Sequence, residues 1–202
     1  ASEAVPRLVK VEAGIKANVV PGKAKATVEG IDLATLETLA EEMKAETGIS
    51  FGFEGSFPVF RITAQGEGAH ASTPQEGKNA LTGLLLYLTR LPLAECGQMD
   101  AVKALVELFP HGDTCGKAAG IAMEDELSGA LTLAFSMLTV SSDSLEGIFD
   151  SRCPICSNED NVLRTVKKNM ADKGVTLENE TMVPPHHVDG NSRFVKTLLA
   201  CY

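Results

Sequence analysis

The feature that most limits the fold of this chain is a repeated order of predicted elements. Residues 8–65 and residues 130–183 each give the order strand, strand, helix, strand. The strands are indicated by alternating apolar and polar residues, and the helices by apolar residues three and four positions apart. We therefore predict an α+β protein made of two related ferredoxin-like lobes, each an antiparallel sheet with helices packed on one face.

The element boundaries follow from turn and cap residues. The first half has predicted strands at residues 8–18, 23–29, 49–54 and 57–64, with a helix between Asp32 and Gly48. The second half has predicted strands at 130–140, 145–152 and 175–183, with a helix that Ser157 caps and that ends before Gly174. Helices are also predicted at residues 81–91, 99–109 and 194–202, the last with Tyr202 on its apolar side.

A histidine lies in a glycine-rich bend at residues 66–80, between a predicted strand and a predicted helix. Thr73 as a hydroxyl cap, Pro74 at the first helical position and Glu76 three residues after the cap indicate that the helix starts there. Glycines let a backbone approach a ligand closely, and the flanking elements can hold a side chain in place. His70 is therefore the first candidate for chemistry.

Composition excludes some classes of partner. The net charge is −9 and Lys and Arg form no cluster, which argues against nucleic-acid binding. The longest apolar runs fall short of the ~20 residues that a membrane-spanning helix needs. No export signal precedes the first strand, and an odd, scattered set of five cysteines is usual for a reducing cytoplasm, so we expect a soluble, cytoplasmic protein.

Three other groups of residues could carry chemistry. Cys153 and Cys156 have the spacing of redox and zinc pairs, so a thiol-redox protein is one alternative function. His111 and Asp113 resemble a metal-binding pair only by their proximity, and a turn is the simpler explanation. Neighbouring His186 and His187 point to opposite faces of an extended chain, so they do not easily serve one metal ion.

Four groups of residues, in order along almost the whole chain, resemble the lid domain of PepV-type dipeptidases. These belong to the two-metal peptidase family that also contains carnosinase and aminoacylase. The matching groups are Asn18-Val19-Val20-Pro21-Gly22; Gly68-Ala69-His70-Ala71-Ser72-Thr73-Pro74 with Gly77-Lys78-Asn79-Ala80; Gly112-Asp113 with Gly120-Ile121 and Asp125-Glu126-Leu127-Ser128-Gly129-Ala130-Leu131-Thr132; and Asp150-Ser151-Arg152-Cys153-Pro154.

The resemblance implies that this chain is the lid inserted between the two halves of a catalytic domain. In that family two zinc ions and a glutamate base lie in the catalytic domain, and none of those motifs is present here. We therefore expect no metal site in this segment, no activity of the isolated segment, and two partners: a dipeptide substrate and the catalytic domain of the same chain. The implied segments are 1–92 as the first lid lobe, 93–128 as a connecting insertion, 129–186 as the second lid lobe and 187–202 as the return into the missing catalytic domain.

The resemblance also implies roles for three residues. His70 resembles the lid histidine that stabilises the oxyanion, Arg152 the arginine that binds the substrate carboxylate, and Asn18 the asparagine that assists it. Structural roles stay open for two of them, since Asn18 could organise the turn before Pro21 and Arg152 could pair with an acidic neighbour. A small-molecule-binding or pairing module without a catalytic parent is the remaining alternative function.

Overall fold

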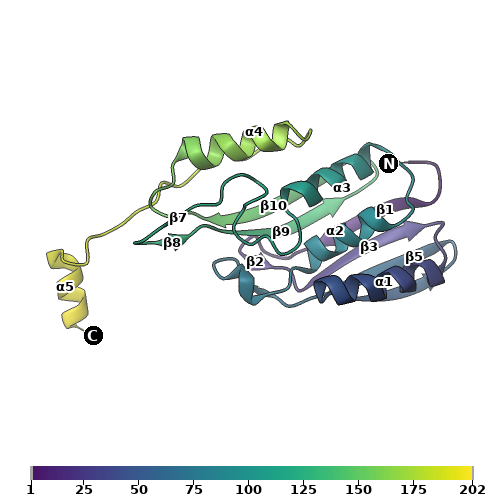
Figure 1. Cartoon of the computed structure of the whole chain (residues 1–202), viewed down its shortest axis with the longest axis horizontal. Helices are drawn as coiled ribbons and strands as arrows, with labels where there is room; N and C mark the ends of the chain where they lie inside the picture. The colour runs from purple at the N-terminus through teal and green to yellow at the C-terminus, as the bar shows by residue number, and fades with distance from the viewer. Residues whose placement is uncertain (1, 202) are drawn as a thin grey trace.

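The computed structural model describes residues 2–201, and its main feature is a single six-stranded antiparallel sheet (Figure 1). The strand order is β10-β9-β1-β3-β5-β4. The six strands are β1 (Arg7–Ala13), β3 (Lys23–Glu29), β4 (Ser50–Ser56), β5 (Val59–Gln65), β9 (Thr132–Val140) and β10 (Leu145–Arg152). Two short pairs lie outside this sheet: β2 (Val19–Val20) with β6 (Ala69–His70), and β7 (Glu124–Asp125) with β8 (Gly129–Ala130).

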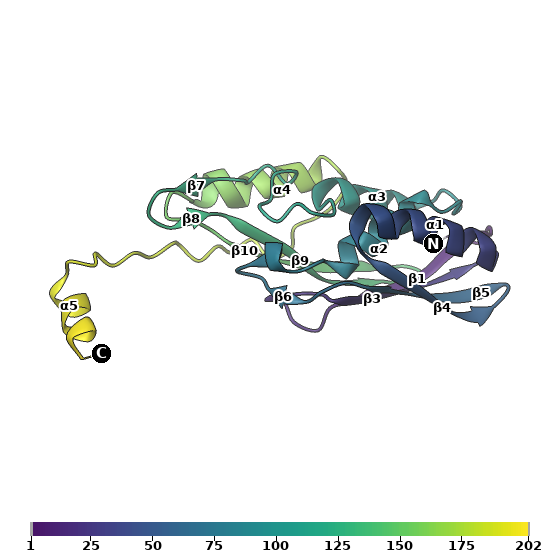
Figure 2. The ribbon, with the colours of Figure 1, turned by 60° about the horizontal axis from the view of Figure 1, so that its bottom comes forward.

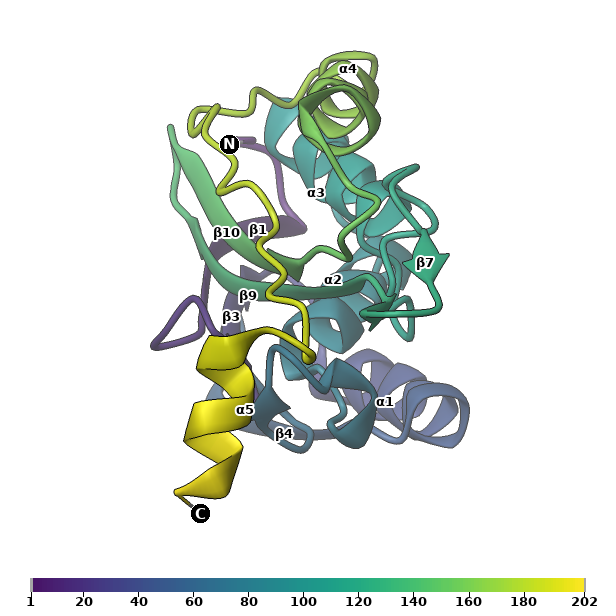
Figure 3. The same cartoon turned by 90° about the vertical axis from the view of Figure 1, so that its left-hand side faces the viewer.

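Four helices cover one face of the sheet, as Figures 2 and 3 show. They are α1 (Leu33–Thr47), α2 (Ala80–Arg90), α3 (Gly97–Leu108) and α4 (Thr165–Ala171). One 3-10 turn, η1 (Pro74–Glu76), precedes α2, and one turn of π-helix, η2 (Glu159–Arg164), leads into α4. The predicted α+β class is confirmed, and none of the helices in residues 2–201 is long and apolar enough to cross a membrane.

Helix α2 lies at the centre of the core. Its residues from Ala80 to Leu85 are all buried, as are Tyr87 and Leu88. The Tyr87 ring stacks on Phe51 of β4 with 4.5 Å between centroids, and its hydroxyl donates to the Leu36 carbonyl of α1 at 2.8 Å. Because the phenol is buried, its pKa is raised, so the hydroxyl stays a hydrogen-bond donor.

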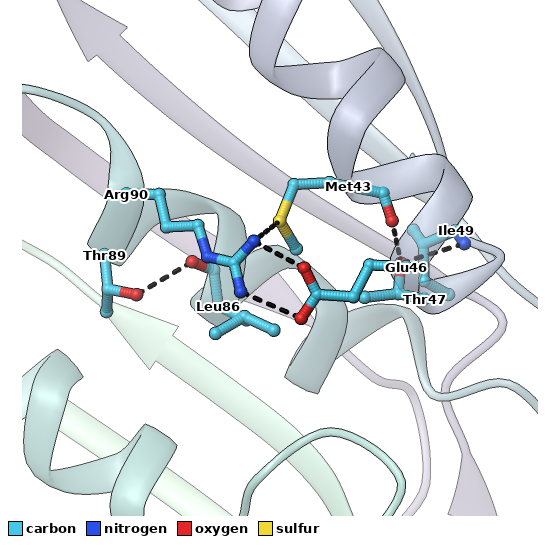
Figure 4. Close-up of polar contacts among 7 residues, drawn as sticks. All are labelled: Met43, Glu46, Thr47, Ile49, Leu86, Thr89 and Arg90. Carbon is cyan, nitrogen blue, oxygen red and sulfur yellow. Dashed lines mark hydrogen bonds and ion pairs between the residues drawn. The ribbon is translucent and has the colours of Figure 1, made fainter.

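An ion pair at the end of α2 joins it to α1 (Figure 4). The Arg90 guanidinium contacts both carboxylate oxygens of Glu46, at 2.5 and 2.8 Å, and one of its nitrogens also lies 3.1 Å from the Met43 sulfur. The hydrogen bonds from Arg90 lower the pKa of Glu46. This two-pronged contact links the ends of the two helices, and both side chains are partly exposed.

The two predicted lobes are joined into one sheet, which the sequence did not indicate. Strand β1 of the first half pairs with β9 of the second through Val11–Val140, Glu12–Thr139 and Ala13–Leu138. The backbone groups along β1 and β9 therefore satisfy one another instead of forming two exposed sheet edges. The predicted boundaries at residues 92, 128 and 186 stay predictions.

The predicted strand at residues 175–183 is wrong. This segment is extended but forms no ladder, while Val175, Leu177 and Met182 lie partly buried against the core. An extended chain that packs alternate side chains on a core has the same sequence pattern as a strand. The segment differs from a strand only in that no neighbouring strand within residues 2–201 pairs with it, and the sequence pattern does not indicate whether such a strand exists.

The helix start predicted at Thr73 is also wrong. Residues Pro74–Glu76 form the isolated turn η1, without a side-chain cap from Thr73. Helix α2 begins at Ala80, where the Asn79 side chain accepts hydrogen bonds from the backbone N–H groups of Leu81 and Thr82 at 3.0 and 3.2 Å. The second predicted cap is displaced by one residue, since Asn158 and not Ser157 caps the turn before α4.

Helix α5 (Arg193–Ala200) stands apart from the rest of the chain (Figures 1 and 2). Residues 175–192 lead to it without helix or strand, and none of its residues is buried. Phe194, Leu198 and Leu199 are 66%, 53% and 69% exposed, so its apolar side is open. The helix predicted at 194–202 is therefore present over most of its length, with Tyr202 outside the described residues.

Asn79 gives a test of this fold. Its amide nitrogen donates to the Phe135 carbonyl of β9 at 2.8 Å while its oxygen caps α2. We expect Asn79→Ala to lower the free energy of unfolding by about 2 kcal/mol, because a helix cap and a partly buried hydrogen bond are lost together.

Urea denaturation of the chain measures this loss. The matched control is Asn158→Ala, which removes an exposed cap with no link to the sheet and should cost about 1 kcal/mol or less. Equal losses for the two variants would contradict the proposed link between α2 and β9.

Candidate functional site

His70 lies at the end of the short strand β6 and is exposed to solvent. Strand β6 pairs with β2 so that His70 is directly opposite Val19. The bend before it folds back tightly, since a Cβ on Gly66 would lie 2.1 Å from the Lys78 carbonyl oxygen. Glycine is thus required where the chain turns into the segment that carries the histidine.

Ser72 fixes the hydrogen-bonding state of the imidazole. The backbone N–H of Ser72 donates to His70 Nδ1 at 3.1 Å, and the Ser72 hydroxyl lies 2.7 Å from the same nitrogen. A nitrogen that accepts a hydrogen bond from an N–H carries no proton, so in the neutral ring the proton is on Nε2. His70 therefore presents an N–H donor on the side of the ring away from its own backbone turn.

Asn18 directly precedes β2 and is bonded to Ala71, the residue after His70. Its backbone carbonyl accepts a hydrogen bond from the N–H of Ala71 at 3.0 Å. Within residues 2–201 its exposed side-chain amide makes no hydrogen bond. The backbone of Asn18 thus organises the segment after His70, while its amide is available for another group.

Arg152 is the last residue of β10 and is exposed. Its Nε lies 2.8 Å from the Asp150 carboxylate, two residues earlier on the same side of the strand. The structural role left open by the sequence is therefore present: the arginine does pair with an acidic neighbour. Because that pair uses Nε, the two terminal nitrogens keep the two-pronged geometry that suits a carboxylate.

A small apolar cluster places the His70 segment against β9. It consists of Val20, Ala71 and Ala134, with Ala69 packed at its side. The Thr132 hydroxyl adds a hydrogen bond to the Ala71 carbonyl at 3.1 Å. Small side chains at these positions let the β2–β6 pair approach the main sheet closely.

The register of β9 and β10 places Arg152 on the face of the sheet from which Ala134 projects. Arg152 is opposite Thr132, and Asp150 is opposite Ala134. Directly opposite residues of an antiparallel pair project from the same face. Phe135, which alternates with Ala134, stacks on Phe109 on the helix-covered side. Arg152 therefore projects from the other face of the sheet, and the segment that carries His70 and Asn18 packs on Ala134 of the same face.

His111 is partly buried between α1 and α2, where it forms hydrogen bonds with both helices. Its Nδ1 is 2.9 Å from the Thr82 hydroxyl and its Nε2 is 3.3 Å from the Thr47 carbonyl, next to a cavity of about 80 Å³. Burial lowers the pKa of His111. Asp113 instead accepts backbone hydrogen bonds from Cys115, Lys117 and Ala118, so the two residues form a turn, as the sequence indicated.

The second cysteine of the pair, Cys156, lies against the turn of the β7–β8 hairpin. The backbone N–H of Cys156 donates to the Asp125 carboxylate at 3.1 Å, and both Cys153 and Cys156 are free thiols. Partial desolvation and then the nearby Asp125 raise the pKa of the Cys156 thiol. A raised pKa disfavours the thiolate that redox exchange requires.

Within residues 2–201 no group of three His, Cys, Asp or Glu side chains could hold a metal ion. His186 and His187 lie exposed in the extended segment before α5. The described residues therefore do not fit a zinc site, and any zinc chemistry would need ligands from elsewhere.

Three residues of this region had no role in the sequence interpretation: Ser72, Thr132 and Asp150. A signal existed for Asp150, because residues two apart in a strand share a face and an acid there can pair with Arg152. Ser72, two residues after His70, could have been considered as a turn partner. Thr132 had no such signal, since its partner Ala71 is distant in the chain.

Comparison with known proteins finds relatives among bacterial dipeptidases. The chain is 32% identical over 199 residues to the Beta-Ala-Xaa dipeptidase of Lactobacillus delbrueckii subsp. lactis. It is 28% identical over 202 residues to the putative dipeptidase YtjP of Bacillus subtilis, and 26% identical over 204 residues to a putative dipeptidase of Staphylococcus epidermidis. No family model matches the chain.

These alignments include 96% of this chain but only 41 to 42% of each of the three relatives. The resemblance to dipeptidases that the sequence indicated is thereby confirmed. A match to about two fifths of each relative fits an inserted domain.

His111 gives a pH-dependent prediction. Its pKa is lowered in the folded state, whereas an unfolded histidine titrates near ~6.5. The unfolded chain therefore binds more protons below about pH 7, so stability falls as the pH drops through 6.5 toward the folded pKa.

We expect His111→Gln to make the unfolding free energy less dependent on pH between about 7 and 5. Thermal or urea unfolding at a series of pH values measures this change. The matched control is His187→Gln at an exposed position, which should keep the pH dependence of the original chain. Identical pH profiles for His111→Gln and the original chain would contradict the assignment.

Proposed function

Starting from its relationship to about two fifths of several bacterial dipeptidases, we propose that this chain is the lid domain of a zinc-dependent dipeptidase. The substrates are unblocked dipeptides, and the complete enzyme is cytoplasmic. The observation that supports the proposal is that the segment with His70 and Asn18 is bonded to β9, next to the strand that ends at Arg152.

His70 acts on the scissile carbonyl. Its Nε2–H is a neutral donor, because Ser72 occupies Nδ1. When the peptide carbonyl becomes tetrahedral, its oxygen gains negative charge, and a donor already aimed at that oxygen stabilises the transition state. The ring needs no proton transfer for this role.

Arg152 and Asn18 bind the other end of the substrate. The terminal guanidinium nitrogens of Arg152 donate two parallel hydrogen bonds to the C-terminal carboxylate, while Asp150 holds Nε. The neutral amide of Asn18 donates a further hydrogen bond without adding charge. Two fixed points, one at the carbonyl and one at the carboxylate, restrict the substrate to the length of a dipeptide.

The remaining machinery lies outside this chain. The described residues do not fit a zinc site, so the two zinc ions expected from the resemblance, and the general base, would be held by a catalytic domain of the same protein. The exposed apolar side of α5, with Phe194, Leu198 and Leu199, is the surface that would pack on that domain. The isolated chain is therefore expected to be inactive.

The thiol-redox alternative has less support. Its candidate thiol, Cys156, has a raised pKa, and hydrogen bonds from Ser128 to Asp125 keep that neighbouring carboxylate negatively charged. A negative neighbour opposes formation of a thiolate. Cys153-Pro154-Ile155-Cys156 instead forms a turn whose backbone binds Ser128 and Asp125 of the hairpin.

The role of His70 is tested by His70→Ala in the complete protein encoded by the gene. We expect kcat to fall by about 100-fold or more with little change in KM, because the lost hydrogen bond forms mainly in the transition state. Steady-state kinetics with a dipeptide measures this, and exposed His187→Ala is the matched control. An unchanged kcat would remove the assigned role.

Arg152 is tested by comparing a dipeptide with the same dipeptide as its C-terminal amide. Arg152→Gln should raise KM for the free acid by about 10-fold or more, because the charge-assisted pair is lost, and should affect the amide much less. Arg61→Gln, at an exposed position of strand β5, serves as the control. Equal losses for acid and amide would exclude carboxylate binding by Arg152.

A further inference from the structure

We propose that Thr132 is a positioning residue that fixes the spacing between His70 and Arg152. This spacing makes the site selective for dipeptides whose C-terminal residue is an α-amino acid. The inference rests on the proposed function, because it concerns the same two substrate-binding groups.

Thr132 contacts the His70 segment through its side chain and is opposite Arg152 in the β9–β10 ladder. Its hydroxyl donates to the carbonyl of Ala71, the residue that follows His70, at 3.1 Å. Across the β9–β10 ladder its backbone is opposite Arg152. One residue of β9 therefore connects the segment that carries the imidazole with the strand that carries the guanidinium.

The Ala71 backbone is bonded on both sides, to the β2–β6 segment through its N–H and to β9 through its carbonyl. Ala71 is fully buried; its N–H donates to the Asn18 carbonyl, and its carbonyl accepts the Thr132 hydroxyl. Contacts among Val20, Ala71 and Ala134 keep the segment close to β9. They resist sliding along the strand only weakly, because the side chains are small and make non-directional contacts. The Thr132 hydroxyl is the side-chain hydrogen bond that ties this segment to β9 in a fixed direction.

Loss of that bond leaves a buried carbonyl without its partner. The carbonyl then recovers a hydrogen bond only if the β6 segment shifts, and a shift moves His70 relative to Arg152. In an α-dipeptide the scissile carbonyl and the carboxylate are separated by the nitrogen and one carbon, whereas a C-terminal β-amino acid adds one methylene. Selection between these substrates depends on the distance that Thr132 fixes.

The test uses the complete protein and three substrates: alanyl-alanine, alanyl-β-alanine and alanyl-alanine amide. Thr132→Val removes the hydroxyl but keeps the β-branched shape that suits a strand. We expect it to lower the ratio of kcat/KM for alanyl-alanine over alanyl-β-alanine by about 3- to 10-fold, the value of one hydrogen bond. Activity on the amide, which lacks the carboxylate, should change less than twofold.

Thr132→Ser keeps the hydroxyl and should restore the original ratio. Thr132→Ala provides the same measurement if the valine variant does not fold. An unchanged ratio in the valine and alanine variants, or equal losses on all three substrates, would overturn the inference, since a purely structural role lowers every activity alike.

Arg152→Gln, measured in the same series, separates this inference from the proposed function. If Arg152→Gln removes the preference for acid over amide while Thr132→Val leaves the α to β ratio unchanged, only the role of Thr132 fails. If Arg152→Gln does not affect that preference, the proposed carboxylate site fails, and the role of Thr132 fails with it.

Discussion

The pairing of β1 with β9 is the contact on which the rest of the structure depends. It joins strands that are separated by most of the chain, from Val11 to Val140, and turns two predicted sheets into one. Helix α2 reinforces the joint, since Asn79 at its start binds the β9 backbone. Because the sheet is continuous, residues of the first half and the second half occupy fixed positions on a common face.

The candidate site uses this continuity at one end of the sheet. His70 and Asn18 are carried by the small β2–β6 pair, which has too few backbone hydrogen bonds to hold a position alone. Packing of Ala71 on Ala134 and the bond from Thr132 attach this pair to β9. Arg152 projects from the same face at the end of β10, the neighbour of β9, so one sheet supports three polar groups from distant parts of the chain.

Local sequence patterns predicted most elements because each pattern reflects burial. Alternation in residues 23–29 matches strand β3, the strand predicted at 145–152 is β10, and Asp32 and Gly48 bound α1 as predicted. The errors occurred where local signals do not specify a partner. Residues 175–183 have the pattern of a strand without pairing, and Thr73 has the features of a cap although α2 begins at Ala80, after its cap Asn79.

The sequence by itself determined the fold class and the resemblance to dipeptidases, and it identified His70, Asn18 and Arg152 as candidates, because composition, periodicity and motifs are local. Only the tertiary structure decided that the two halves share one sheet and that the segment of His70 and Asn18 packs on β9, the neighbour of the strand that ends at Arg152. The tautomer of His70 and the link through Thr132 also appeared only there. These features depend on register between strands far apart in the chain, and local sequence does not encode register of that kind.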